Sequence, residues 1–333
     1  MMVQDWSNAM EIKDLQKIMQ DNGVVGAGGA GFPSYAKLTD KADTILLNCA
    51  ECEPLLKLHR QLLEKHAYEI MKTFHTVMET VGASQAIIGI KKSYVQTVKA
   101  LQQHIEEFPG LKLHLLDEVY PMGDEVVLIY EATGRVCRPG GLPIEQGVIV
   151  FNVETIYNVY QALESQKPVT EKYVSVVAEV EHPVTVKVPL GCTLDEVVAQ
   201  AGDITTKDPV YFVGGPMMGR AMVDLSSPVT KGCSGITVLG GAEAQRGAES
   251  ACIKCAKCVQ ACPMGLEPYL LSKLSRKQLW ERLEGEEVTS CIECGCCQFT
   301  CPADLPLLDY IRLGKQRVMG LIRARAAANA PKK

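Results

Sequence analysis

The stretches ESACIKCAKCVQACPMGLEP, residues 249–268, and TSCIECGCCQFTCPADLP, residues 289–306, decide the fold of this chain. Each contains four cysteines spaced C-x2-C-x2-C-x3-C and followed at once by proline. Three closely spaced thiolates surround one 4Fe–4S cluster, and in two-cluster ferredoxins the fourth cysteine binds the other cluster. The doubled pattern therefore predicts two 4Fe–4S clusters and the transfer of electrons one at a time.

Crossed ligation gives each cluster a definite set of cysteines. One cluster is assigned to Cys252, Cys255, Cys258 and Cys301, and the other to Cys262, Cys291, Cys294 and Cys297. Zinc knuckles are the alternative, but zinc sites usually pair two C-x2-C halves or include histidine, and neither stretch contains histidine. Cys296 falls outside the spacing. We interpret it as a bystander near the second cluster, with a role as substitute ligand as the other possibility.

The composition restricts the class of protein. A chain of 333 residues, 47% of them hydrophobic, has room for two or three domains. A net charge of −5 argues against nucleic acid or an anionic membrane surface as partner. Residues 1–10 lack the basic and apolar segments of a signal peptide, and no stretch approaches the roughly 18 apolar residues of a membrane span. Fourteen cysteines without an export signal predict a reducing cytoplasm rather than disulfides, and oxygen-labile clusters favour an anaerobic or microaerobic cell.

The stretch GVVGAGGAGFPSYAKL, residues 23–38, is rich in glycine. Gly26, Gly28 and Gly31 satisfy G-x-G-x-x-G, but a dinucleotide-binding fingerprint follows a strand and opens a helix. Here only two valines precede the loop, and Pro33 follows it. Since glycines lack Cβ atoms, the backbone N–H groups of such a loop can approach a phosphate or a flat ring closely. The loop is predicted to be either a ligand cradle or a turn-rich connector.

Strand and helix patterns alternate over the next hundred residues and predict a parallel α/β sheet. The strands are expected at 44–50, 86–90, 111–116 and 147–153, and the helices at 10–21, 55–81, 94–108 and 124–133. Ligands of such sheets collect at the carboxyl ends of the strands. Glu51 and Glu53 follow the first strand in NCAECEP, and Asp124 and Glu125 follow the third in YPMGDE. The simpler interpretation of Asp124 is that it complements the helix dipole.

From Lys172 the pattern changes to a small α+β module. Two strands and a turn lead to a short helix capped by Thr193 together with Asp195 or Glu196, and Gly-rich segments follow. The residues after 306 are expected to be helical. His59, on a helix, and His182, in a turn, are interpreted as structural residues.

Several of these motifs occur together in one known family. GAGGAGFPS with Lys37, ECEP, YPMGDE and FNVET resemble the flavin- and NADH-binding subunit of respiratory complex I. With AECEP, PGGLP, GGPMMG and the doubled cysteine motif, the chain is closer still to the C subunit of the Rnf sodium- or proton-pumping complex. The cobalamin reductases of propanediol-using microcompartments share this plan. The resemblance extends from residue 20 to about residue 306.

The resemblance implies a three-part architecture. A Rossmann-like α/β domain for FMN and NADH is expected in residues 1–165, a soluble-ligand-binding β-grasp module in 166–240, and an α-helical ferredoxin-type domain with two clusters in 241–333. Because the chain begins close to the glycine loop and has no long C-terminal tail, we expect a soluble short form of the Rnf subunit rather than a component of a membrane pump.

The resemblance also implies which residues bind the cofactors. Lys37 matches a lysine near the FMN phosphate, Glu51 and Glu53 match an acidic pair near flavin and nicotinamide, and Glu125 matches a glutamate of the third motif. The remaining FMN contacts are Gly26, Gly28, Gly29, Gly31, Phe32 and Asn152. Two positions depart from the complex I pattern, since Ser34 replaces threonine and Ala27 replaces arginine.

Together these features imply an NADH-dependent flavin and iron–sulfur oxidoreductase. NADH donates a hydride while clusters accept single electrons, so a flavin is required between them. The expected partners are ferredoxin, a flavoprotein or reductase subunits in a hetero-oligomeric complex. Two alternatives stay open, a reductase of cobalamin or another substrate, and a relay subunit that receives electrons from a partner flavoprotein. The terminal acceptor and the direction of electron flow are also left open.

Overall fold

The computed structural model describes residues 10–29 and 31–329. These residues form two compact units, one of residues 10–137 and 142–241, the other of residues 138–141 and 242–329. Residues 1–9, on which the prediction about a signal peptide rests, lie outside the described part. In the helices that the structure describes, no segment is both long enough and apolar enough to cross a membrane.

The first unit contains a four-stranded sheet in which all neighbouring strands are parallel. The strands are β1 (Thr44–Asn48), β2 (Gln85–Lys91), β3 (Leu111–Leu116) and β4 (Val148–Asn152), in the order β3-β2-β1-β4. Parallel neighbours are joined by helices, as the alternating sequence pattern predicted. The α/β fold class is thus confirmed.

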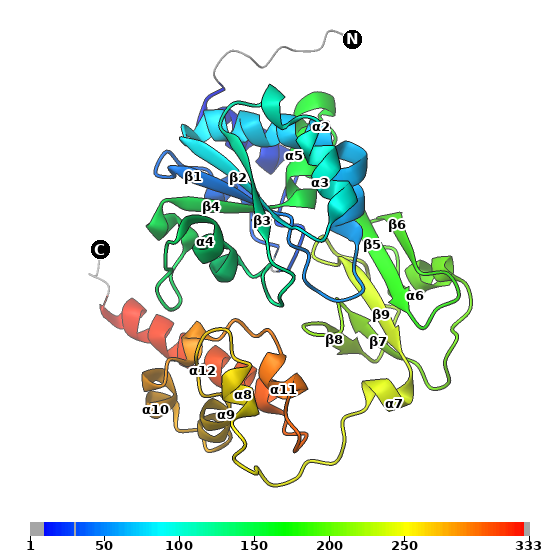
Figure 1. Ribbon diagram of the computed structural model, residues 1–333, viewed down its shortest axis with the longest axis vertical. Coiled ribbons are helices and arrows are strands. Elements are labelled where there is room, and N and C mark those ends of the chain that lie inside the picture. The colour runs from blue at the N-terminus through cyan, green and yellow to red at the C-terminus, as the bar shows by residue number, and fades with distance from the viewer. Residues whose placement is uncertain (1–9, 30, 330–333) are drawn as a thin grey trace. The chain divides into compact units, whose positions relative to one another are not determined.

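Helices cover both faces of this sheet (Figure 1). The helices are α1 (Ile12–Asp21), α2 (Leu58–Val81), α3 (Val95–Gln102), α4 (Glu125–Thr133) and α5 (Val153–Ser165). Along β1, Ile45 and Leu47 pack into the core formed with α1, α2, α3 and α5, whereas Leu46 points into a second core with α4. This alternation arises because successive strand side chains point to opposite faces.

Element boundaries differ from the expectations in a few places. Helix α2 begins at Leu58 rather than at residue 55, because Leu55 has a φ of 71°, which is left-handed and not helical. Helix α3 ends at Gln102, and a separate 3-10 turn follows at Ile105–Glu107. Further 3-10 turns lie at Ser34–Lys37, Pro143–Gln146, Ala199–Ala201 and Val288–Ser290. The glycine loop lies between α1 and the turn Ser34–Lys37, ahead of β1, so it is not the strand–loop–helix fingerprint of dinucleotide-binding folds.

A second, five-stranded sheet completes the first unit. Its strands are β5 (Glu171–Ala178), β6 (Val184–Pro189), β7 (Val210–Val213), β8 (Arg220–Met222) and β9 (Gly235–Leu239), in the order β6-β5-β9-β7-β8. Strand β9 pairs with β5 in parallel, and the other pairs are antiparallel. Thr193 and Glu196 form the expected capping box of α6 (Leu194–Val198). A hairpin, a helix and a strand that returns parallel to the first strand form the arrangement of a β-grasp fold.

A buried ion pair joins helix α5 of this unit to its five-stranded sheet. Lys172, on β5, contacts Glu154, on α5, and the side chains of both residues are 1% exposed. The second carboxylate oxygen of Glu154 accepts a hydrogen bond from Tyr173 N at 3.2 Å. The domain boundary proposed between residues 165 and 166 stays a prediction, and these bonds cross it.

We expect Lys172→Met to destabilise the first unit strongly. Removal of one partner leaves a buried charge without its counterion, which typically costs about 3–5 kcal/mol of unfolding free energy. Urea unfolding followed by circular dichroism measures this loss. Lys17→Met is the matched control, since Lys17 pairs with Asp21 at 3.1 Å on the surface, where a pair is worth about 0–1 kcal/mol. Equal urea midpoints of unfolding for the two variants would contradict the prediction. The double variant Lys172→Met/Glu154→Gln should recover part of the lost unfolding free energy, because it leaves no buried charge without a partner.

The second unit is helical. Its helices are α8 (Lys257–Gln260), α9 (Pro268–Arg276), α10 (Trp280–Gly285), α11 (Cys296–Phe299) and α12 (Leu307–Asn329), and α7 (Gly241–Ala244) lies at the junction of the two units. Leu271, Leu283, Val288, Ile311 and Val318 form its core. Helix α12 confirms the helix predicted after residue 306.

Candidate functional site

The second unit contains a cavity of about 850 Å³ lined by cysteines. The cysteines at this cavity are Cys252, Cys255, Cys258 and Cys301. Cys252 and Cys255 are exposed, while burial raises the pKa of the Cys258 thiol. The cavity is thus lined by three thiols of the first motif and the last thiol of the second. These are the four cysteines to which the spacing assigns one cluster.

The remaining four cysteines of the doubled motif line a second cavity. They are Cys262, Cys291, Cys294 and Cys297, and the other lining residues are mostly apolar. Burial raises the pKa of Cys291 to about 11 and that of Cys297 to about 12. Among the described side chains, no three histidines, cysteines or carboxylates converge on a point where one metal ion would be held. The first set surrounds a cavity of about 850 Å³ and the second a cavity of only about 20 Å³, so it is the grouping of the thiols in fours that fits a cluster offering each ligand its own iron atom.

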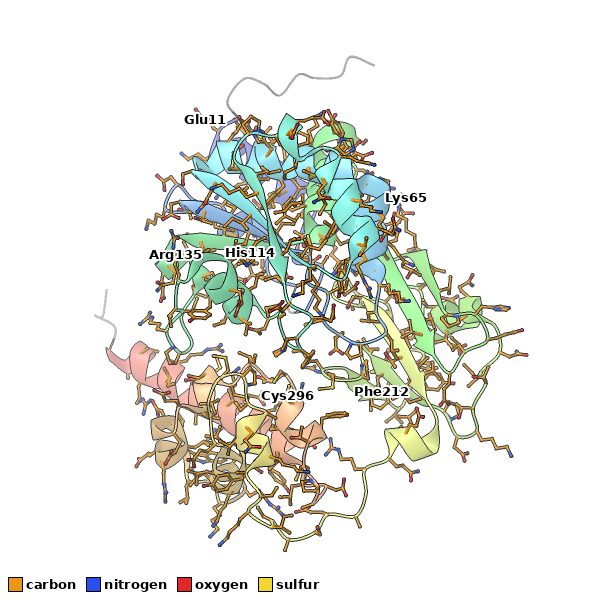
Figure 2. All side chains as sticks on the ribbon, in the orientation of Figure 1. Glu11, Lys65, His114, Arg135, Phe212 and Cys296 are labelled. Carbon is orange, nitrogen blue, oxygen red and sulfur yellow. The ribbon has the colours of Figure 1, made fainter. Side chains whose placement is uncertain are left out.

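The two cysteine motifs have the same backbone conformation at matching positions. Lys254 and Ala256 in the first motif have φ values of 58° and 60°, and Glu293 and Gly295 in the second have 59° and 84°. These left-handed residues turn the chain sharply between the cysteines. Cys296, on α11 and labelled in Figure 2, lines neither cavity. Its role as a bystander stays a prediction.

In the first unit, a hydrogen bond joins the two ends of the glycine loop, and the space beside its middle glycines is open. Gly26 N donates to Phe32 O at 2.8 Å. Gly29 and Gly31 have φ values of 92° and 64°, and a Cβ at either would meet nothing within 4 Å. Ala27 N donates to Thr155 Oγ1 at 3.0 Å, which fixes the loop to the start of α5. The loop therefore offers backbone and open space, as a cradle for a phosphate or a flat ring requires.

A chain of side-chain contacts leads from this loop to Glu51. A Cβ at Gly28 would lie 3.1 Å from Asn152 Nδ2, and that nitrogen lies 3.1 Å from His59 Nε2. His59 Nδ1 lies 3.8 Å from a carboxylate oxygen of Glu51, whose other oxygen accepts from His59 N at 3.2 Å. The Asn152 Oδ1 atom caps α5 at Glu154 N. His59, interpreted from sequence as structural, thus lies between two of the predicted site residues.

Lys37 lies near the same edge of the parallel sheet. Its Nζ donates to Val150 O at 2.9 Å, lies 3.6 Å from Glu125, and lies 5.9 Å from the centre of the Phe32 ring. Phe32 itself is exposed. The structure therefore brings the lysine, the aromatic ring and the third-motif glutamate together, with a cation available to an anionic group.

Glu53 binds the backbone of the GGPMMG loop, residues 214–219. Its carboxylate accepts from Met217 N at 3.0 Å and from Met218 N at 2.6 Å. A Cβ at Gly215 would lie 2.2 Å from this carboxylate, so only glycine permits the approach. Burial raises the pKa of Glu53. Both carboxylate oxygens thus accept hydrogen bonds from the chain, a contact that the sequence pattern did not indicate.

The YPMGDE motif packs against the end of β1. Asn48 Nδ2 donates to Gly123 O at 2.8 Å, and a Cβ at Gly123 would lie 1.9 Å from Ala50 O. Asp124 caps α4 by accepting from Val126 N at 2.9 Å, which confirms the simpler interpretation of this residue. Glu125 is the first residue of α4. The motif therefore contributes to the same carboxyl edge of the sheet as the glutamates after β1.

Two known domain families match the two units. The Nuo51 FMN-binding domain matches residues 19–161, and the 4Fe–4S dicluster domain matches residues 251–306. The NAD+-reducing NiFe-hydrogenase in its H2-reduced state has a similar structure, with a TM-score of 0.66 over 97% of this chain and 68% of that chain. At 19% identity this similarity shows the fold.

Longer matches come from whole proteins. The cobalamin reductase PduS of Citrobacter freundii is 36% identical, over 95% of this chain and 74% of that protein. The C subunit of the Na+-translocating ferredoxin:NAD+ oxidoreductase complex of Acetobacterium woodii is 32% identical, over 93% of this chain and 71% of that protein. The C subunit of the proton-translocating complex of Clostridium ljungdahlii is 33% identical, over 83% of this chain and 62% of that protein.

A flavin-binding domain followed by a dicluster domain defines an electron-transfer oxidoreductase subunit of the flavin and iron–sulfur class. Within that class, this chain belongs to the family formed by the C subunits of the ion-translocating Rnf oxidoreductases and the PduS cobalamin reductases. The resemblance found in the sequence motifs is thereby confirmed.

Proposed function

We propose that this protein transfers electrons between NADH, FMN, two 4Fe–4S clusters and a partner electron carrier in the cytoplasm of an anaerobic cell. The observation that carries the proposal is the sorting of eight cysteines into two cavities of four, in a chain whose first unit has an open glycine loop. Bound FMN would supply the exchange between two-electron and one-electron chemistry. NAD and ferredoxin are also the substrates in the name of the Acetobacterium woodii relative.

The residues around the glycine loop have distinct tasks in this proposal. The backbone of Gly26, Gly28, Gly29 and Gly31 approaches the flavin mononucleotide. Lys37 offsets the charge of its phosphate, and Asn152, held by His59 and the start of α5, lies beside the loop. Phe32, exposed on the loop, offers an aromatic face.

We assign the nicotinamide side of the site to the carboxylates at the sheet edge, Glu51, Glu53 and Glu125. Glu51 accepts a hydrogen bond from His59 N, and Glu53 accepts two from the GGPMMG loop. The two carboxylates therefore fix the conformation of the chain around the site and also give the site negative charge. A carboxylate beside the ribose would repel the 2′-phosphate of NADPH, which favours NADH.

The proposal is tested on protein purified without oxygen. We expect a flavin absorbance band that bleaches when NADH is added, together with about eight iron atoms and eight sulfides per chain. A flavin that NADH leaves oxidised, but that a reduced partner flavoprotein bleaches, would favour the relay function instead. Zinc in place of iron and sulfide would contradict the cluster assignment.

Cobalamin reduction is a second candidate function, because the relatives at 36% and 35% identity are named cobalamin reductases. NADH-reduced protein mixed with hydroxocobalamin separates the candidates. Reoxidation of the flavin with a matching change in the cobalamin spectrum supports this function, and a reduced protein that persists beside unchanged hydroxocobalamin rejects it.

Glu53→Gln is expected to weaken NADH binding while FMN stays bound. The amide keeps the shape, but it has one acceptor oxygen, so one of the N–H groups of Met217 and Met218 loses its partner. A hydrogen bond to a charged group is worth about 1.5–3 kcal/mol, so a GGPMMG loop that loses one such bond is expected to lower NADH affinity by up to roughly ten- to a hundredfold. The measurement is anaerobic stopped-flow flavin reduction against NADH concentration.

Glu106→Gln is the matched control, since Glu106 is exposed on a 3-10 turn. We expect this variant to match the wild type. If Glu53→Gln also keeps the wild-type dependence on NADH, the GGPMMG loop has no part in nucleotide binding. If Glu53→Gln loses its flavin, Glu53 supports the FMN site directly.

A further inference from the structure

We propose that the mouth of the first cysteine cavity is the docking surface for a small acidic protein that carries one electron at a time. The inference rests on the proposed function, because it requires a cluster in that cavity, and it adds where the partner binds and what charge the partner has. It starts from four cationic residues among those that line the cavity, which we call the basic rim. The basic rim comprises Lys254, Lys273, Arg276 and Lys277.

The positive charge of the basic rim is only partly balanced by neighbouring carboxylates. Its residues are all exposed, and Arg276 pairs with Glu249 at 2.7 Å. Within the described chain, the three rim lysines form no ion pair with a carboxylate. Two other carboxylates lie nearby: Glu267 accepts a hydrogen bond from Tyr269 Oη at 3.1 Å, and exposed Asp304 lies between the cavity-lining residues Ala303 and Leu305, so the four cations still outnumber the three carboxylates. A local excess of cations on a chain of net charge −5 selects for an acidic partner surface.

The second cysteine set has none of these surface features. At the position matching Lys254 it has Glu293, which lies 3.1 Å from both Arg312 and Lys315, so its charge is compensated. Cys294 and Cys297 are buried, whereas Cys252 and Cys255 of the first set are exposed. Among the described residues, only the first of the two sets includes exposed cysteines.

Apolar side chains at the same mouth complete a surface suited to brief protein contact. Ile253 is 67% exposed and Tyr269 is 42% exposed, and both line the cavity. A small apolar centre surrounded by charge is suited to transient redox complexes, which bury little area and depend on electrostatic attraction for fast association. The partner class that this surface fits is an acidic ferredoxin-type carrier.

The proposed step is a single electron transfer. Cys252, Cys255, Cys258 and Cys301 would hold the cluster, which would accept one electron from the reduced carrier as that carrier is oxidised. Two such transfers, with one proton from water, balance the conversion of one NAD+ to NADH. The reverse flow uses the same contact.

The test measures electron transfer from a reduced acidic two-cluster ferredoxin to the holoprotein by stopped flow. Lys273→Glu/Lys277→Glu reverses two charges of the rim without touching the cysteine loop. We expect its second-order rate constant to fall about tenfold at low salt, with the difference shrinking at high salt because screening then acts over roughly 3 Å. Arg317→Glu/Arg323→Glu is the matched control, with the same change in net charge on exposed residues of α12.

Iron content and NADH-driven flavin bleaching, recorded on the same samples, separate this inference from the proposed function. If clusters and bleaching are normal but the rim and control variants give equal ferredoxin rates, the docking surface is refuted. The same holds if basic cytochrome c exchanges electrons with the wild type as fast as ferredoxin does at low salt. If NADH fails to bleach the flavin, but only the rim variant lowers the rate constant of electron transfer from ferredoxin, the docking surface is supported and the assignment of the NADH site is wrong.

Discussion

Cys301→Ala is expected to lower the iron content from about eight atoms per chain to about four. Cys301 lies in the second sequence motif but lines the cavity of Cys252, Cys255 and Cys258. Its loss therefore removes the cluster whose other ligands lie 43 to 49 residues earlier in the chain. Iron and sulfide assays, with electron paramagnetic resonance of the dithionite-reduced protein, measure the result.

Two comparisons make this prediction specific. Cys296→Ala is the matched control, because Cys296 lies in the same motif and lines neither cavity, so it should keep about eight iron atoms. Combining Cys301→Ala with Cys252→Ala should remove no further iron, since both residues serve one cluster. Combining Cys301→Ala with Cys291→Ala should remove both clusters. The opposite pattern would mean that each motif binds its own cluster without crossing.

Gly28→Val is expected to abolish FMN binding while both clusters stay in place. Even a Cβ at residue 28 would lie 3.1 Å from Asn152 Nδ2, and the larger valine side chain would fill the open side of the loop or displace Asn152. Either outcome removes space or a contact that the proposed flavin site needs. Flavin released by heating and measured by fluorescence, beside the iron content, gives the result.

Gly320→Val provides the control for this change. A Cβ at Gly320 meets nothing within 4 Å, and the residue lies in α12, far along the chain from the glycine loop. This variant should bind as much FMN as the wild type. Full FMN content in Gly28→Val would show that the loop is a connector, the alternative that the sequence had left open.

The parts of the structure that follow from short-range patterns were predicted well. The parallel strands are short apolar runs between amphipathic helices, so their positions depend on local periodicity. The grouping of Cys301 with the first motif could also be anticipated, because the C-x3-C-P spacing holds the fourth thiol away from the other three. Thr193 was predicted as a helix cap because capping depends on residues only three positions apart.

The contacts that sequence reasoning missed join residues far apart in the chain. Glu53 binds Met217 and Met218, which lie more than 160 residues later. His59 meets Asn152 only because the start of α2 and the end of β4 arrive at the same edge of the sheet. No local pattern marks such residues, since their partners are chosen by the packing of the whole unit.

The bonds of Glu53 to the GGPMMG loop, and of Glu154 to Lys172, restrict how this protein can be engineered. Each bond links the part of the unit built on the parallel sheet to the part built on the five-stranded sheet, so the two parts must come from sequences that match each other. A chimera that takes the β-grasp segment from a relative must bring partners for both glutamates. Exchange of the whole first unit, residues 10–137 and 142–241, keeps every one of these bonds and is the safer design.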